Sequence, residues 1–196
     1  MPSLISEYVP QSAVGEDAAR RRRVGLLSWG AAAVFGLAVL GLVLSAPALR
    51  ANGSPLLSQV VYKLFSGACH QIPERSFYLW GFPLAVCARC AGLYAGAAAG
   101  LLAYPLVRRP LGRTDAPPRA WLLLAVLPTT VDLLLGVTGL WENTHLSRFL
   151  TALLAGAAAA FYVVPGCVEL GGRAWRRFGG QLDLREGGRG EVSRLT

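Results

Sequence analysis

Four long stretches of apolar residues limit what this chain can fold into more than any other feature of its sequence. The first covers residues 24–46 and contains 23 positions without a charged side chain, and three more cover residues 84–106, 120–140 and 149–168. An α-helix rises about 1.5 Å per residue, so about 20 apolar residues cross the roughly 30 Å hydrocarbon core of a bilayer. The sequence therefore predicts an all-α, polytopic integral membrane protein with four transmembrane helices.

The composition agrees with this prediction, and the length of the first run argues for a retained helix. Charged residues make up 15% of the chain, whereas soluble domains usually carry about 25%. A cleaved secretory signal is the alternative for the first run, because the small residues of SAPALRA follow it. Signal cores usually have about 7–15 apolar residues behind a short basic start. This core has 23 residues and follows 23 mostly polar positions.

Basic residues indicate how the helices are oriented. Fourteen of the 19 Lys and Arg residues lie within segments 20–23, 108–119 and 173–194. These segments fall on one side if four helices alternate, and the positive-inside rule then places both termini in the cytoplasm, with the protein in the plasma or inner membrane. The net charge of +8 is thus a topology signal. The lipid bilayer is the expected partner, and nucleic acid is not.

The chain divides into three parts at the ends of the apolar region. Residues 1–23 are expected to form a basic cytoplasmic tail, residues 24–168 the four-helix transmembrane domain, and residues 169–196 a flexible cytoplasmic tail. Residues 47–83 form the longest link between apolar runs, and alternation places this link outside the cytoplasm.

A short interfacial helix is predicted within this outer link. Ser54 followed by Pro55 is typical of a helix start. Leu56, Val60 and Leu64 then recur at helical spacing. We expect this helix to lie on the membrane surface and to end just before Cys69 and His70, and no segment of the chain reads as a strand.

The second run carries small residues on its packing face. Gly92, Gly96 and Gly100 recur every four residues, and the fourth run repeats this spacing. Small residues at this spacing let helices approach closely in lipid. The glycines of GLYAGAAAG therefore predict helix packing, because their spacing matches neither a dinucleotide fingerprint nor a phosphate loop.

Reactive side chains are concentrated around the start of the second run. Cys87 and Cys90 form a C-x-x-C pair there, and Cys69 with His70 precedes it in the outer loop. A helix N-terminus lowers thiol pKa, and thiolate is both metal ligand and nucleophile. The group is a candidate site for zinc or another transition metal. A structural or redox disulfide and plain apolar packing remain the alternatives.

Two further residues bear on this site. His145, in the short outer loop after the third run, is a further candidate metal ligand or general acid–base group. Cys167 lies near the inner end of the fourth run and is expected to act as apolar filler, out of reach of the other three cysteines.

Two charged residues fall within the apolar runs. Arg89 lies about six residues inside the second run and Asp132 about eight residues inside the third, counted from the outer face. Charges in hydrocarbon usually face the bundle interior and pair with a partner. We expect the second and third helices to be neighbours and to form an Arg89–Asp132 ion pair. The alternative is that Arg89 extends to the outer headgroups.

The predicted outer rim adds groups that suit an anion. Arg75, Asn143 and Arg148 supply guanidinium and amide donors for phosphate or carboxylate. An anionic or lipid-linked ligand is therefore the expected small-molecule partner, and no motif for an organic cofactor is present. Candidate catalytic residues are His70, Arg75, Arg89, Asp132, Asn143 and Arg148.

The motifs CHQIPERSF and CARCAGLYAG, followed by an intramembrane Asp and the segment ENTHLSR, resemble the DUF2085 family of predicted prokaryotic membrane proteins. The resemblance covers about residues 57–165. It implies a small polytopic membrane protein and no particular activity. Three functions stay open: a membrane metalloprotein or metalloenzyme, a binding protein or transporter for an anion or lipid headgroup, and a structural protein with a disulfide.

Overall fold

The computed structural model describes residues 11–109 and 111–192, with side chains from Ala18 to Ala174. Four of its helices contain segments long and apolar enough to cross a membrane. The predicted number of spans and the all-α membrane fold are thereby confirmed. The four helices are α1 (Gln11–Ala51), α3 (Ala88–Val107), α4 (Arg119–Val137) and α5 (His145–Val192).

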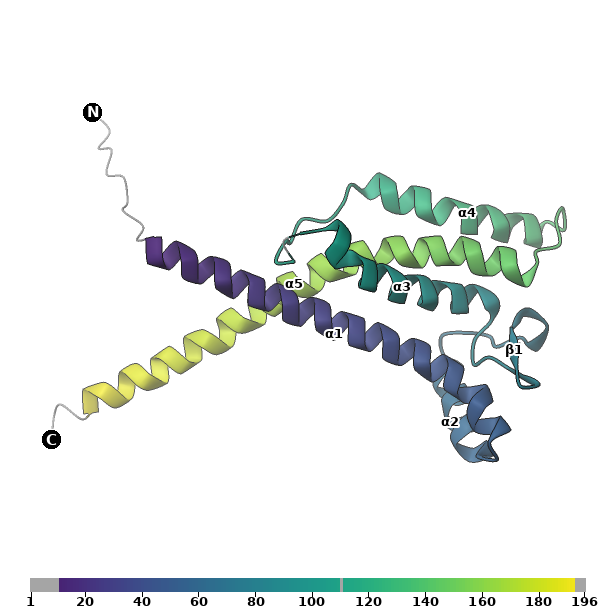
Figure 1. Cartoon of the computed structure of the whole chain (residues 1–196), viewed down its shortest axis with the longest axis horizontal. Helices are drawn as coiled ribbons and strands as arrows, with labels where there is room; N and C mark the ends of the chain where they lie inside the picture. The colour runs from purple at the N-terminus through teal and green to yellow at the C-terminus, as the bar shows by residue number, and fades with distance from the viewer. Residues whose placement is uncertain (1–10, 110, 193–196) are drawn as a thin grey trace.

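The helices form a bundle whose connecting loops lie mainly at one end (Figure 1). That end carries the start of α3, the start of α5 and the link between α1 and α3, and we call it the loop end. The far ends of α1 and α5 leave the bundle in the opposite direction, so both described chain ends lie away from the loop end. This arrangement follows from an even number of spans.

The first and last helices, α1 and α5, are longer than the apolar runs within them. α1 already begins at Gln11 and α5 continues to Val192, although flexible backbone was expected over residues 169–196 and a tail over residues 1–23. Alanine, arginine and glutamate favour helix and allow the residues before 24 to continue α1. The residues beyond 168 include seven glycines, and helix propensity does not explain why α5 continues there. Residues 1–10 and 193–196 lie outside the described part of the chain.

The second span begins later than expected. α3 starts at Ala88, four residues after the start of the apolar run, because residues 84–87 are irregular. Cys87 is the residue that precedes the helix. Arg89 therefore lies in the first turn of α3, rather than six residues inside the span.

The predicted interfacial helix is present as α2 (Pro55–Phe65). Its inner face buries Ser58, Val61 and Phe65, and the Ser58 hydroxyl donates a hydrogen bond to the carbonyl of Ala46 at 2.8 Å. Its outer face exposes Leu56, Leu57, Val60 and Leu64, with Leu56 at 77% exposure. An apolar outer face suits a helix that lies against lipid.

A short hairpin follows α2, although no strand was predicted. The two-residue strands β1 (Tyr78–Leu79) and β2 (Phe82–Pro83) pair antiparallel through a turn at Trp80 and Gly81, which both have positive φ. Positive φ at both central residues is the geometry of a tight hairpin turn. Strands of two residues are too short to give an alternating sequence pattern, so the prediction was wrong here.

The α3–α5 contact is the largest in the bundle and rests on the predicted small residues. The two helices run in the same direction, and Gly92, Gly96 and Gly100 of α3 face the backbones of Phe149, Leu153 and Ala157. A methyl group on Gly92 or Gly96 would overlap the carbonyl oxygen opposite it. Glycine is therefore required for the approach of these two backbones.

The order of the helices differs from the expected one in one respect. α4 packs against α5, and α3 and α4 make only slight direct contact. Spans two and three were expected to be neighbours, and they meet through the Arg89–Asp132 ion pair, whereas the close backbone contact of α3 is made with α5. The space left between the loop ends of α3 and α4 holds the candidate site.

The first prediction concerns the glycine contact. Gly96→Ala should lower the free energy of unfolding by about 1–3 kcal/mol or more, because an overpacked contact must separate the two backbones. Gly166→Ala in α5 is the matched control, because nothing lies within 4 Å of a Cβ there. It should be neutral or stabilising by up to about 1 kcal/mol, since alanine favours helix over glycine. Unfolding of the detergent-solubilised variants measures both, and equal effects would contradict the assignment.

Candidate metal centre and arginine-lined cavity

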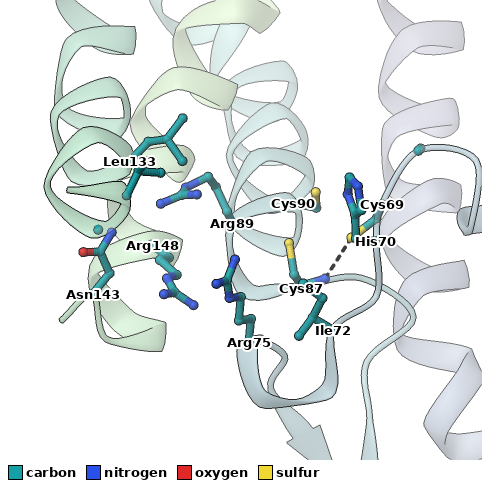
Figure 2. A pocket seen from close by; sticks show the side chains of 13 residues that line it. Cys69, His70, Ile72, Arg75, Cys87, Arg89, Cys90, Leu133, Asn143 and Arg148 are labelled. Atoms are coloured by element: carbon teal, nitrogen blue, oxygen red, sulfur yellow. Dashed lines mark hydrogen bonds between the residues drawn. The ribbon is translucent and has the colours of Figure 1, made fainter. Parts of the chain in front are cut away.

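A cavity of about 530 Å³ opens at the loop end between α3, α4 and α5 (Figure 2). Three loops and three helices line it, so residues far apart in the sequence meet there. Eight of the predicted site residues are among its lining residues. They are Cys69, His70, Arg75, Cys87, Arg89, Cys90, Asn143 and Arg148.

Three cysteine thiols form a group at one side of this cavity. The Sγ atoms of Cys69, Cys87 and Cys90 all lie within 4.8 Å of one another, and none is bonded to another. Cys69 is buried, and the other two are half-buried. In a tetrahedral zinc site with Zn–S bonds of about 2.3 Å, sulfur atoms lie roughly 3.8 Å apart. The three thiols are therefore close to a spacing that one metal ion can hold.

Backbone amides point at the sulfur of Cys69. The N–H of Cys87 donates to this Sγ at 3.2 Å and the N–H of Gln71 at 3.5 Å. Hydrogen bonds donated to sulfur stabilise the thiolate over the thiol. The loop thus directs two N–H donors at the Cys69 sulfur and fixes its position beside Cys87.

Gln71 fixes the loop in this conformation. Its φ of 51° is in the left-handed region, which is uncommon for a residue other than glycine. Its side-chain amide donates to the carbonyl oxygens of Tyr62 at 2.6 Å and Ala85 at 2.7 Å. These two hydrogen bonds join α2 to the segment before α3 and hold a backbone conformation that the chain would otherwise avoid.

The surroundings of the Cys87 thiol favour the loss of its proton. Hydrogen bonding by the Cys90 thiol lowers the pKa of Cys87 well below its ordinary value, against the opposing effect of burial. The Cys69 thiol and the backbone contribute further in the same direction. Cys87 also precedes the first turn of α3, where the helix dipole favours negative charge.

The two histidines have different positions. His70 is exposed and lines the cavity beside the thiols. His145 lies elsewhere: its Nε2 is 3.0 Å from the carbonyl oxygen of Glu74, and its ring lies 5.8 Å from that of Phe77. His145 thus attaches the start of α5 to η1 (Pro73–Arg75). Cys167 is 19 residues beyond Arg148 on α5, which is about 28 Å along the helix.

The expected ion pair is present at the opposite side of the cavity. Nη2 of Arg89 lies 2.6 Å from Oδ2 of Asp132, and the Asp132 side chain is only 7% exposed. The second carboxylate oxygen, Oδ1, accepts a hydrogen bond from the Ser147 hydroxyl at 2.9 Å. The amide of Asn143 donates to the backbone carbonyl of Asp132. One carboxylate therefore joins α3, α4 and the start of α5.

Gly136 on α4 leaves room for the Asn143 side chain. A Cβ on Gly136 would lie 2.7 Å from Nδ2 of Asn143. The Asn143 Oδ1 atom and the Nε atom of Arg89 are both buried without a hydrogen-bond partner among the described residues. One donor and one acceptor are thus left unused within the wall of the cavity.

Arg75 and Arg148 complete the lining. Arg75 comes from η1 and Arg148 from the first turn of α5, and Figure 2 shows both guanidinium groups at the same side of the cavity as Arg89. No carboxylate within the described part of the chain pairs with either of them. The Asp132 carboxylate is already occupied by Arg89 and Ser147.

Three residues that position the site were not predicted from the sequence pattern. Gln71 holds the Cys69 loop, Ser147 holds the Asp132 carboxylate, and Gly136 makes room for Asn143. Gln71 stands within the CHQ motif, which was the one available signal. Ser147 stands within the ENTHLSR segment, although its contact with Asp132 joins distant segments, and no local pattern marks Gly136.

Comparisons with known proteins agree with the membrane fold and leave the activity open. The family described as "Predicted membrane protein (DUF2085)" matches residues 69–162. An uncharacterized protein of Methanocaldococcus jannaschii is 38% identical over 114 residues, which are 58% of this chain and 72% of the relative. An uncharacterized protein of Methanothermobacter thermautotrophicus is 38% identical over 96 residues, 49% of this chain and 84% of the relative. No solved structure matches the chain.

The second prediction tests the Arg89–Asp132 pair by a double-mutant cycle. Asp132→Leu alone should cost about 3–5 kcal/mol of unfolding free energy at most, because it leaves a half-buried guanidinium without its partner. Arg89→Met together with Asp132→Leu should recover much of that loss. The exposed Arg113–Asp115 pair, 2.8 Å apart, is the matched control, and its coupling should be below about 1 kcal/mol. Additive single effects at Arg89 and Asp132 would contradict the pairing.

Proposed function

The chain belongs to the DUF2085 family of predicted membrane proteins, and from this premise we propose that it is a membrane metalloprotein. The ligands that we propose are the thiolates of Cys69, Cys87 and Cys90, and the metal is one transition metal ion, by default zinc. Thiolates suit soft or borderline ions, and three cysteines match the ligand types of zinc sites.

The observation that carries this proposal is the convergence of the three Sγ atoms within 4.8 Å. Two of these cysteines come from the start of α3 and the third from a loop 18 residues before Cys87. The loop is held by the Gln71 side chain, and two backbone amides point at the Cys69 sulfur. Donors of this kind around a ligand sulfur are typical of metal sites, where they orient the ligand.

The position of the thiols beside the cavity supports a reactive rather than a sealed centre. Three protein ligands leave a fourth position of a tetrahedral ion, and all three cysteines line the cavity. An ion there would act as a Lewis acid toward a water or a ligand in the cavity. His70 lines the same cavity and is the candidate fourth ligand, which would close the site instead.

The third prediction is a metal count of the purified full-length chain. The unchanged protein should carry about one zinc per chain, because three close thiolates bind it together, and Cys87→Ser should lose most of it. Cys167→Ser is the matched control and should retain the metal, because Cys167 lies about 28 Å along α5 from Arg148. Elemental analysis gives the metal content, and intact mass under non-reducing conditions gives the thiol state.

Two results would decide between the metal and a disulfide. A mass two hydrogens short together with no stoichiometric metal would contradict the metal centre and leave a disulfide among the three cysteines. His70→Ala should leave the metal bound if the site has three protein ligands, and should weaken binding if His70 closes it.

We further propose that the loop end lies outside the cytoplasm and that both termini lie inside it. The described ends of α1 and α5 leave the bundle on the side opposite the loop end (Figure 1). Four arginines at residues 20–23 and the basic link after α3 belong to that side. The positive-inside rule places such segments in the cytoplasm.

The fourth prediction tests this orientation. A single cysteine introduced at Asp115 in a chain without its native cysteines should be protected from a membrane-impermeant thiol reagent in intact cells. The same change at Glu142 should be labelled, because it lies in the loop between α4 and α5 at the other end. Labelling at Asp115 with protection at Glu142 would reverse the orientation.

A further inference from the structure

We infer that the cavity binds a phosphate-bearing ligand through the guanidinium groups of Arg75 and Arg148. This inference goes beyond the metal centre and concerns different side chains in the same cavity. The cavity carries more positive than negative side chains. Arg89 is neutralised by Asp132, but Arg75 and Arg148 have no acidic partner within the described ranges.

The two free arginines lie close together. Arg75, Arg89 and Arg148 all line the cavity, and Figure 2 shows their guanidinium groups at one side of it. Like charges held near one another cost free energy unless an anion lies between them. Even a metal bound by three thiolates, with one net negative charge, would leave the cavity with an excess of positive charge.

The shape of guanidinium favours phosphate over carboxylate. Each guanidinium group presents a planar fork of N–H donors that two oxygens can accept together. A phosphate group has enough oxygens to accept a full fork from each of two guanidinium groups. One carboxylate has two oxygens and must share one of them between two guanidinium groups, as Asp115 does between Arg108 and Arg113. The starts of α3 and α5 lie at the same end of the bundle and add partial positive charge there.

The wall opposite the thiols is apolar. Leu133, Gly136 and Val137 of α4 line the cavity, and Val137 is also 76% exposed on the outside of the bundle. A ligand with a phosphate on the arginines would place its next atoms against this wall. Both a phospholipid headgroup and a free phosphate compound have the required group, so the test uses a probe for each source.

The experiment measures binding to the full-length chain in phosphatidylcholine nanodiscs. One arm titrates the protein with radiolabelled inorganic phosphate and, as the carboxylate control, with sodium acetate at the same ionic strength. The other arm places a minor fraction of phosphatidic acid in the disc and counts the phosphatidic acid molecules that remain bound by native mass spectrometry. Saturable binding of either probe is expected, and the arm that shows it identifies the source of the ligand.

Matched variants assign the binding to the cavity. Arg75→Gln and Arg148→Gln should each weaken binding about tenfold or more, because each removes one charged fork. Arg148→Lys keeps the charge, and should recover only part of the affinity. Arg50→Gln is the control: it removes one positive charge at the same end of the bundle, where Arg50 lies over the Phe82 ring at 5.2 Å. Arg75 is exposed, so its variant should fold normally.

Each outcome either supports the inference or overturns it. Binding that Arg75→Gln and Arg148→Gln weaken and Arg50→Gln leaves unchanged supports it. The absence of saturable binding of both probes, or equal losses in all three variants, overturns it in favour of diffuse electrostatic attraction. Phosphate binding should also persist after metal removal by a chelator, so a failed metal centre and a failed phosphate site give different results.

Discussion

The close contact of α3 with α5 is the constraint on which the rest of the structure depends. Glycines 92, 96 and 100 face backbone carbonyls on α5, and the Ala160 methyl group also lies close to Gly100. In lipid, such packing supplies association that the hydrophobic effect does not. Because the helices run in the same direction, the contact also brings their two N-terminal turns to one level, so Arg89 and Cys90 of α3 share a cavity with Arg148 of α5.

The site divides one cavity between two kinds of chemistry. Thiol sulfurs gather around Cys69, and guanidinium donors gather around Arg148. The Arg89–Asp132 pair stands among them and joins α3 to α4, which otherwise make little contact. A metal and an oxyanion that occupied the two sides together would lie within one water-accessible space, an arrangement that metal-assisted reactions of phosphate compounds use.

The sequence was sufficient for the number of spans, the interfacial helix, the small-residue contact and the Arg89–Asp132 pair, because each follows from apolar length, period or the cost of a buried charge. The sequence was insufficient where the local structure depends on contacts with segments that are distant in the chain. The late start of α3 depends on the irregular residues 84–87, and the Trp80–Gly81 hairpin is too short for a pattern. The hydrogen bond between His145 and Glu74 joins segments 71 residues apart. The sequence spacing therefore could not show that His145 lies away from the thiols.

Asp132 is the only buried residue of α4 within the described part of the chain, and this has a consequence for biogenesis. On insertion scales, an aspartate near the centre of a span costs about 2.5–3.5 kcal/mol. Arg89 precedes it in the chain, whereas Asn143 and Ser147 follow it. During synthesis the carboxylate thus enters the bilayer after its cation and before Ser147, its neutral hydrogen-bond donor. A charge neutralised at the translocon lets α4 partition into lipid, and the hydrogen bonds form only once α5 has joined the bundle.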